Sequence, residues 1–121
     1  MQSFEDILRL ANDARTRIRE ISPIDARERV ESGAVLIDVR EEKEFRAGNI
    51  PGAILVSRDV LETRITEVVP DKSTPIVAYC TIGHRSAIAA DTLQQLGYVN
   101  VTSIEGGLNA YLASSSERKI A

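Results

Sequence analysis

Two short and nearly uninterrupted apolar segments constrain the fold of this chain more than any other feature. Residues 34–39 read AVLIDV and residues 76–79 read IVAY. Because neither segment alternates regularly between apolar and polar residues, both are typical of strands that are buried on two faces. Segments with helical spacing lie between them. Strands that alternate with helices predict an α/β domain with a mainly parallel sheet.

The other predicted elements follow from apolar spacing and from the residues that begin and end helices. Residues 3–20 carry an apolar stripe at helical spacing, which predicts an amphipathic helix. Ser22-Pro23 begins a short helix that ends at Gly33, since serine caps helices and proline is favoured in their first turn. Further helices are predicted over 41–47, 61–69, 85–96 and from 107 on, and further strands over 53–56 and 99–104. The polar tail at 114–121 is expected to fray.

The length, the charge and the apolar runs of the chain disfavour a multidomain, a nucleic-acid-binding and a membrane-associated protein. A chain of 121 residues with interspersed charges of both signs predicts one globular domain. The net charge of -3 disfavours nucleic acid and anionic membranes as partners. No apolar run approaches the ~20 residues of a membrane span. We therefore expect no nucleic-acid partner and no membrane partner.

Cysteine usage indicates the compartment. Cys80 is the single cysteine, so an internal disulfide cannot form, and the cysteine and histidine clusters of zinc sites are missing. The amino terminus lacks the basic and apolar segments of a signal peptide. These features predict a cytoplasmic protein with no metal and no cofactor.

Cys80 is also the residue that best indicates a function, because it lies between a predicted strand and a predicted helix. It follows the predicted strand 76–79, a loop with Gly83 comes next, and a helical pattern begins at Arg85-Ser86. Peptide N–H groups and the dipole at the start of a helix favour an anion, and a thiolate is one. The pattern predicts a nucleophile, whereas a lone cysteine elsewhere is more often an inert core residue.

Three segments, taken together and in order, resemble the rhodanese domain in its single-domain sulfurtransferase form. The first is 36–53, LIDVREEKEFRAGNIPGA, and the second is the loop 80–86, CTIGHRS. The third runs from LGYV at 96–99 to IEGGLNAY at 104–111. The chain departs from the family pattern at Asn49, Thr81 and Tyr111, and its amino-terminal helix lies outside the pattern. Thr81 stands where the family often has a polar or cationic side chain.

The resemblance implies a five-stranded parallel sheet flanked by helices. Residues 1–20 would form an extra amino-terminal helix, and residues 21–121 a single rhodanese-like domain. It also implies a thiosulfate sulfurtransferase-like enzyme, in which Cys80 accepts a sulfane sulfur, becomes a persulfide and passes the sulfur to cyanide or a thiol. The residues that would bind the substrate are Thr81, Ile82, Gly83, His84, Arg85 and Ser86. The implied partners are a small sulfur donor and a small or protein acceptor, for a monomer or a homodimer.

Side chains of the cysteine loop have both structural and functional interpretations. Gly83 is expected to supply a positive φ or a bare backbone. Arg85 either stabilises the thiolate and holds an anionic donor, or pairs with an acidic group such as Glu44. His84 either acts as a base for Cys80 or contacts substrate or solvent, and we prefer the contact.

Residues outside that loop carry four further expectations. Asp38 and Arg40 end a buried strand and are expected to pair with each other or with Glu44. Arg58 is expected near the mouth of the pocket that holds Cys80. Gly106-Gly107 is expected to allow close packing where the last strand meets its helix. The amino-terminal helix is expected to pack on the domain, with a dimer contact as the alternative.

Two other functions fit parts of the pattern. A cysteine phosphatase or arsenate reductase also places a cysteine and an arginine in a loop before a helix. Four residues separate Cys80 from Arg85, one fewer than in the phosphatase signature, and the shorter loop suits one sulfur better than a phosphoryl group. The other alternative is a non-catalytic interaction or sulfur-relay module. Such modules tend to lose the cysteine or its loop, and this chain keeps both.

Overall fold

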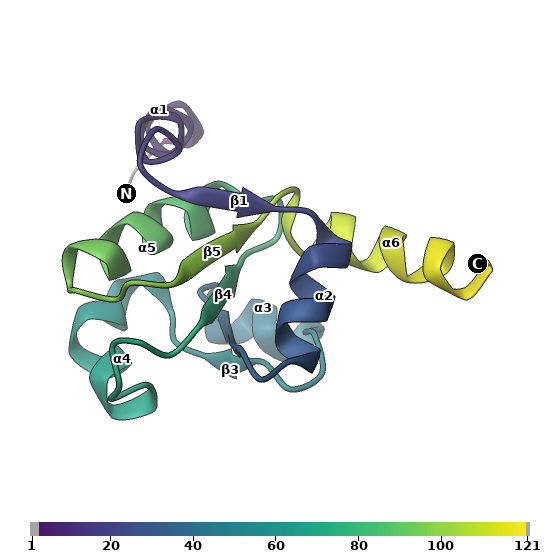
Figure 1. The fold of residues 1–121 in the computed structure, drawn as a ribbon. Coiled ribbons are helices and arrows are strands. Elements are labelled where there is room, and N and C mark those ends of the chain that lie inside the picture. The colour runs from purple at the N-terminus through teal and green to yellow at the C-terminus, as the bar shows by residue number, and fades with distance from the viewer. Residues whose placement is uncertain (1–2, 121) are drawn as a thin grey trace.

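The computed structural model describes the backbone of residues 3–120 and the side chains of residues 3–114. Within these residues a five-stranded sheet has the order β1-β5-β4-β2-β3, and every neighbouring pair is parallel (Figure 1). The strands are β1 (Arg19–Ile21), β2 (Val35–Asp38), β3 (Ile54–Leu55), β4 (Ile76–Tyr79) and β5 (Val101–Ile104). The predicted α/β class and the parallel sheet are confirmed.

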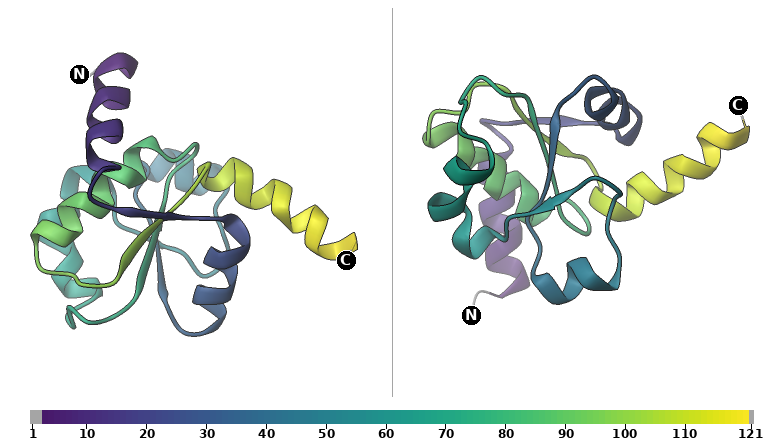
Figure 2. Two further views of the ribbon diagram at one scale, coloured as in Figure 1. Left: turned by 45° about the horizontal axis from the view of Figure 1, so that its top comes forward. Right: turned by 90° about the horizontal axis from the view of Figure 1, so that it is seen from below.

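Helices cover both faces of this sheet. They are α1 (Phe4–Ala14), α2 (Pro23–Glu31), α3 (Glu42–Ala47), α4 (Leu61–Val68), α5 (His84–Gln95) and α6 (Gly107–Ile120), with a 3-10 turn, η1, at Arg58–Val60. Helices α4 and α5 lie on one face, and α2 and the first turns of α6 lie on the other. Helix α1 packs along α5, and α6 projects away from the body of the protein (Figure 2). No described helix has the length and apolar composition needed to cross a membrane.

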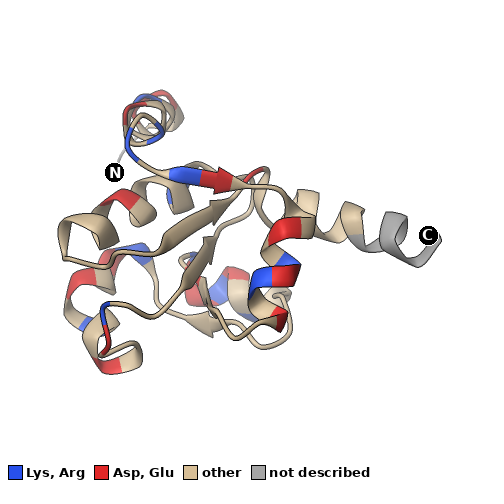
Figure 3. Ribbon diagram, viewed as in Figure 1, with Lys and Arg blue, Asp and Glu red and all other residues tan. Residues whose placement is uncertain are grey.

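Alternating side chains of the central strands supply two separate cores. Ile37 and Ala78 pack on the side of α4 and α5, whereas Leu36, Val77 and Tyr79 pack on the side of α2 and α6. Because a strand that feeds two cores needs apolar residues at every position, these strands appear in the sequence as unbroken apolar runs. Accordingly, β4 and β5 carry no charged residue in Figure 3.

The amino-terminal region differs from the sequence prediction. The helix predicted over residues 3–20 ends at Ala14, and Arg19–Ile21 forms strand β1 beside β5. Ile21 stands opposite Ile104 and is buried. Ile18 and Ile21 continue the helical spacing of α1, so the local pattern could not reveal a strand whose partner lies far along the chain.

Two further boundaries differ. The last strand begins at Val101 and not at residue 99, and the Val99 side chain is 77% exposed. Helix α6 continues to Ile120, so the frayed tail predicted from residue 114 is helical up to that point. Elsewhere the predicted start of α2 is confirmed, because the Ser22 hydroxyl accepts from the Asp25 N–H at 3.1 Å.

A buried ion pair closes the carboxyl end of β2. The Arg40 guanidinium donates to both carboxylate oxygens of Asp38, at 3.1 Å from Nε to Oδ1 and 2.8 Å from Nη2 to Oδ2. Both side chains are almost fully buried, and Arg40 also donates to the Gly48 carbonyl at 2.6 Å. The predicted mutual pairing is confirmed. It ties the end of β2 to the chain after α3, directly beside the cysteine loop.

Removal of the Asp38 carboxylate should destabilise the fold strongly. We expect Asp38→Ala to lower the free energy of unfolding by about 3–5 kcal/mol, because it leaves the Arg40 charge buried and unpaired. Glu42→Ala is the matched control, since Glu42 pairs with Arg46 on the surface. That control should cost about 0.5 kcal/mol or less. Chemical denaturation measures both, and equal losses would show that burial of the Asp38–Arg40 pair is unimportant.

Candidate active site at the cysteine loop

The Cys80 sulfur lies at the bottom of a tight loop between β4 and α5. Its side chain is 1% exposed, and Sγ accepts hydrogen bonds from the Gly83 N–H at 3.1 Å and the Ser86 N–H at 3.3 Å. Two peptide donors converging on one sulfur at a helix start favour an anionic sulfur. Among the described residues, no hydrogen bond uses the N–H groups of Thr81, Ile82, His84 or Arg85. The loop therefore has further donors for an anion.

Gly83 adopts the backbone conformation that lets the loop turn back on the sulfur. Its φ is +103°, in the left-handed region that side chains rarely adopt, as the sequence predicts. An added Cβ would also lie only 3.3 Å from the backbone nitrogen of Gly106. The conformation therefore favours glycine here, and an added Cβ would also require the Gly106 backbone to shift slightly.

The Gly106-Gly107 pair packs against the cysteine loop itself. The Leu108 N–H donates to the Cys80 carbonyl at 2.8 Å, and the Asn109 N–H donates to the Thr81 carbonyl at 3.2 Å. A Cβ on Gly107 would stand 2.5 Å from the Cys80 carbonyl oxygen. The predicted close packing is present, and its partner is the backbone that carries the nucleophile.

A pair of buried hydroxyls supports the loop from below. Ser86 Oγ lies 2.8 Å from Ser103 Oγ and 3.5 Å from Cys80 Sγ, and both serines are fully buried. No local motif marks Ser103 as part of the site. The sequence feature that could have pointed to Ser103 is the polar Thr-Ser pair at residues 102–103, inside an otherwise apolar strand.

Arg85 forms a two-pronged ion pair with Glu44. Its Nη1 and Nη2 atoms lie 2.8 Å from the two carboxylate oxygens, and Nη2 also donates to Thr81 Oγ1 at 3.3 Å. The guanidinium holds the pKa of Glu44 at about 2, and the carboxylate in turn raises the pKa of Arg85, with a smaller contribution from the charge on Cys80. The structural pairing expected for Arg85 is therefore present.

His84 faces the amino-terminal helix. Arg15 Nη2 lies 3.0 Å from His84 Nδ1, and the His84 and Phe4 rings make a T-shaped contact with their centroids 5.8 Å apart. Burial and the Arg15 charge lower the pKa of His84, so the imidazole is neutral at neutral pH. Because arginine can only donate, Nδ1 accepts and the ring proton lies on Nε2.

A cavity of about 360 Å³ opens above the sulfur. It is lined by Phe4, Ile7, Glu44, Cys80, Thr81, Ile82, His84 and Arg85. The structure thus brings the predicted loop residues Thr81, Ile82, His84 and Arg85 to the cavity wall, and places Gly83 and Ser86 against the sulfur. Arg58, predicted near the mouth, is not among the lining residues. The sequence pattern does not mark Phe4 and Ile7 as residues of the site, because their stripe resembles that of an ordinary packed helix.

A second hollow, of about 490 Å³, lies at the amino ends of the strands. It is lined by Arg19, Asp25, Glu28, Arg29, Ser32, Ala34, Pro75 and Asn100. In open parallel sheets, ligands bind outside the carboxyl ends of the strands. The smaller cavity has that position and holds the cysteine, so it is the candidate active site.

Comparisons with known proteins show what the chain resembles in sequence and fold. The rhodanese-like domain model matches residues 22–114. Thiosulfate sulfurtransferase GlpE of Pseudomonas savastanoi pv. phaseolicola is 30% identical over 105 residues, which cover 87% of this chain and 97% of the relative.

Two solved structures share the fold. The polysulfide-sulfur transferase homodimer of Wolinella succinogenes is 27% identical with a TM-score of 0.74, covering 87% of this chain and 80% of that one. A Rhodopseudomonas palustris protein of unknown function, described as a possible tyrosine phosphatase, is 30% identical with a TM-score of 0.81 and 95% coverage of both chains.

Gly107→Ala should disrupt the site through the backbone contact. Gly52 provides the matched control, because its φ of +89° is also left-handed but nothing lies within 4 Å of an added Cβ. We expect Gly52→Ala to cost about 1–2 kcal/mol of conformational strain. Gly107→Ala should add about 1–3 kcal/mol of overpacking. Thermal unfolding measures the difference, and equal destabilisation by the two variants would contradict the contact.

The Arg85–Glu44 pair should give stability a defined dependence on pH. The pKa of Glu44 is depressed from 4.5 to about 2, so its contribution is complete above pH 4.5 and is lost as the pH falls toward 2. Melting temperatures of the wild type and of Glu44→Gln should therefore differ most above pH 4.5 and converge toward pH 2. A difference that stays constant over this window would show that the charged pair contributes nothing.

Proposed function

The chain belongs to the rhodanese-like domain family, and we propose that it transfers a sulfane sulfur from a donor to a thiophilic acceptor through a persulfide on Cys80. Relatives named thiosulfate sulfurtransferase support a transferase of this type. The observation that carries the proposal is the position of the Cys80 sulfur. It receives two peptide N–H bonds at the bottom of a cavity at the carboxyl end of β4.

The proposed chemistry has two balanced half-reactions. With thiosulfate, the Cys80 thiolate attacks the outer sulfur, the sulfur–sulfur bond breaks, and sulfite leaves with the electron pair. The product is a Cys80 persulfide anion, which the N–H groups of the loop can stabilise as they stabilise the thiolate. Cyanide or a thiolate then attacks the terminal sulfur and restores the Cys80 thiolate. No proton is transferred between the ionised reactants, so a general base is unnecessary.

The loop residues have separate proposed roles. Gly83 and Ser86 donate N–H groups to the sulfur, and Arg85, held by Glu44, forms part of the cavity wall that a substrate contacts. Thr81 holds Arg85 through its hydroxyl, and Ile82 contributes to the wall of the cavity.

His84 is proposed to contact substrate and not to act as a base. Its Nδ1 accepts from Arg15, and none of the hydrogen bonds found for its side chain in the described residues reaches Cys80. The neutral ring lines the cavity beside the loop, where it meets a bound donor or acceptor.

With one cysteine in the chain, the acceptor must come from outside. An internal disulfide cannot discharge the persulfide, so cyanide, a small thiol or a protein thiol must take the sulfur. The names of two relatives suggest thiosulfate and polysulfide as donor classes. Both present a terminal sulfane sulfur to the same attack.

A phosphatase is the less favoured function, although one structural relative is described as a possible tyrosine phosphatase. Four residues separate Cys80 from Arg85, and Arg85 is already paired with Glu44 on both terminal nitrogens. A phosphoryl group needs an arginine free to hold its oxygens. A non-catalytic module is also less favoured, because the cysteine and its donors are intact.

Three organisational features accompany the proposal and stay predictions. One relative is a homodimer, and we keep both monomer and homodimer for this chain. The predicted division into an amino-terminal segment at 1–20 and a single rhodanese-like domain at 21–121 stays a proposal, with the correction that Arg19 and Glu20 already pair with β5 in the sheet. The location is proposed to be cytoplasmic.

Intact-protein mass spectrometry tests the proposal directly. The wild type incubated with thiosulfate or polysulfide should gain the mass of one sulfur atom, and cyanide should remove it and release thiocyanate. Cys80→Ser should show no adduct while its melting temperature stays close to that of the wild type. An adduct that persists in Cys80→Ser, or no adduct with any donor, would refute sulfur transfer at Cys80.

A further inference from the structure

Helix α1 contributes to the cavity above Cys80, although it precedes the residues that the family model matches. Phe4 and Ile7 lie in its first two turns and line the cavity opposite the cysteine loop. The helix is therefore a wall of the site as well as a cover for α5.

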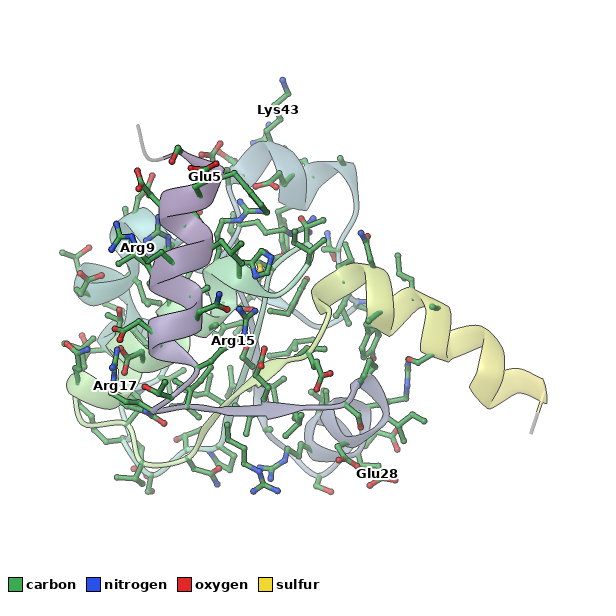
Figure 4. The ribbon with its side chains drawn as sticks, turned by 90° about the horizontal axis from the view of Figure 1, so that it is seen from above. Glu5, Arg9, Arg15, Arg17, Glu28 and Lys43 are labelled. Atoms are coloured by element: carbon green, nitrogen blue, oxygen red, sulfur yellow. The ribbon has the colours of Figure 1, made fainter. Side chains whose placement is uncertain are left out.

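Polar bonds at the carboxyl end of α1 fix its position. Arg15 donates to the Gly83 carbonyl at 3.4 Å and to His84 Nδ1 at 3.0 Å, and Arg17 pairs with Asp91 of α5 at 2.8 Å. Arg15 lies on the side of α1 that faces the centre of the protein, whereas Arg9 points away (Figure 4). Two of these bonds join Arg15 to the cysteine loop. They therefore hold α1 at a fixed position relative to Cys80.

The wall that α1 provides is apolar and incompletely covered. Phe4 is 62% exposed although its ring packs against His84, and Ile82, which lines the same cavity, is 46% exposed. Ile7 lines the same cavity and is half-buried. Apolar side chains that gather around a reactive group and stay open to solvent favour an apolar ligand.

The charges of the cavity do not suit a small dianion. Arg85 is the single lysine or arginine among the described lining residues, and Glu44 neutralises it through two contacts of 2.8 Å. His84 is neutral at neutral pH. The peptide N–H groups can stabilise one negative charge at the transferring sulfur, but a second charge would find no free cation on the wall.

We infer that α1 makes this site selective for sulfur donors that carry an apolar group, with Phe4 and Ile7 as the residues that determine specificity. The donor class that fits is an organic thiosulfonate, a monoanion in which an aryl or alkyl sulfonyl group bears the sulfane sulfur. The inference rests on the proposed sulfur transfer at Cys80. It adds which donors the site prefers and assigns that preference to α1.

The transfer step balances for this class. The Cys80 thiolate attacks the terminal sulfur, the bond between that sulfur and the sulfonyl sulfur breaks, and a sulfinate leaves with the electron pair. The products are the Cys80 persulfide anion and an aryl or alkyl sulfinate, so the two negative charges are conserved. During the attack the apolar group lies against Phe4, Ile7 and Ile82.

Loading rates measured by intact-protein mass spectrometry test the inference. The rate constant for addition of one sulfur to Cys80 is measured with benzenethiosulfonate, methanethiosulfonate and thiosulfate. The benzene-to-methane ratio is then compared between variants, so that the intrinsic reactivity of each donor cancels. We expect Phe4→Ala and Ile7→Ala each to lower this ratio about five- to tenfold, because each removes apolar contact with the ring.

Two further variants serve as controls. Phe4→Leu should keep most of the preference, since it retains an apolar side chain in α1. Leu112→Ala removes a comparably exposed apolar side chain from α6, far along the chain, and should leave the ratio unchanged. Circular dichroism should show the same overall helix content in each variant as in the wild type.

The outcomes separate the inference from the proposed function. A ratio that is the same in Phe4→Ala, Ile7→Ala and the wild type, with normal loading of Cys80, would overturn the role of α1 and leave sulfur transfer standing. Faster loading by thiosulfate than by benzenethiosulfonate in the wild type would also overturn it. No sulfur adduct from any donor would refute the proposed function itself.

Discussion

The cysteine loop depends on a backbone contact between two distant segments of the chain. The first turn of α6 donates two N–H groups to the carbonyls of Cys80 and Thr81, and Gly107 approaches them too closely for any side chain. Because β4 and β5 are parallel neighbours, their carboxyl ends deliver these segments to the same edge of the sheet. With its carbonyls held there, the loop can direct the Gly83 and Ser86 N–H groups at the sulfur.

The charged side chains around this contact form ion pairs. Asp38 neutralises Arg40 at the end of β2, and Glu44 neutralises Arg85 at the cavity wall. Asp38 is the last residue of β2 and Glu44 lies in α3, so one short stretch of chain stabilises the fold and adjusts the charge of the site. The N–H groups at the sulfur are left as the main means of stabilising an anion, which suits a persulfide with one negative charge.

Local patterns predicted most of the fold because they report burial directly. The unbroken runs at β2 and β4 indicated strands between two cores, and Ser22-Pro23 marked the start of α2. Strand β1 was missed because three residues paired only with β5 carry no period of their own. Its Arg19 and Glu20 are permitted at the edge of a sheet, where side chains reach solvent.

The sequence by itself determined the α/β class, the rhodanese resemblance and the position of Cys80 between a strand and a helix. Each of these is encoded in residues that are close together in the chain. Only the tertiary structure decided that α1 reaches over the cavity, that Arg15 bonds to the cysteine loop, and that Ser103 lies under Ser86. Those contacts join residues far apart in the chain, and no local period or motif records which distant side chains will meet.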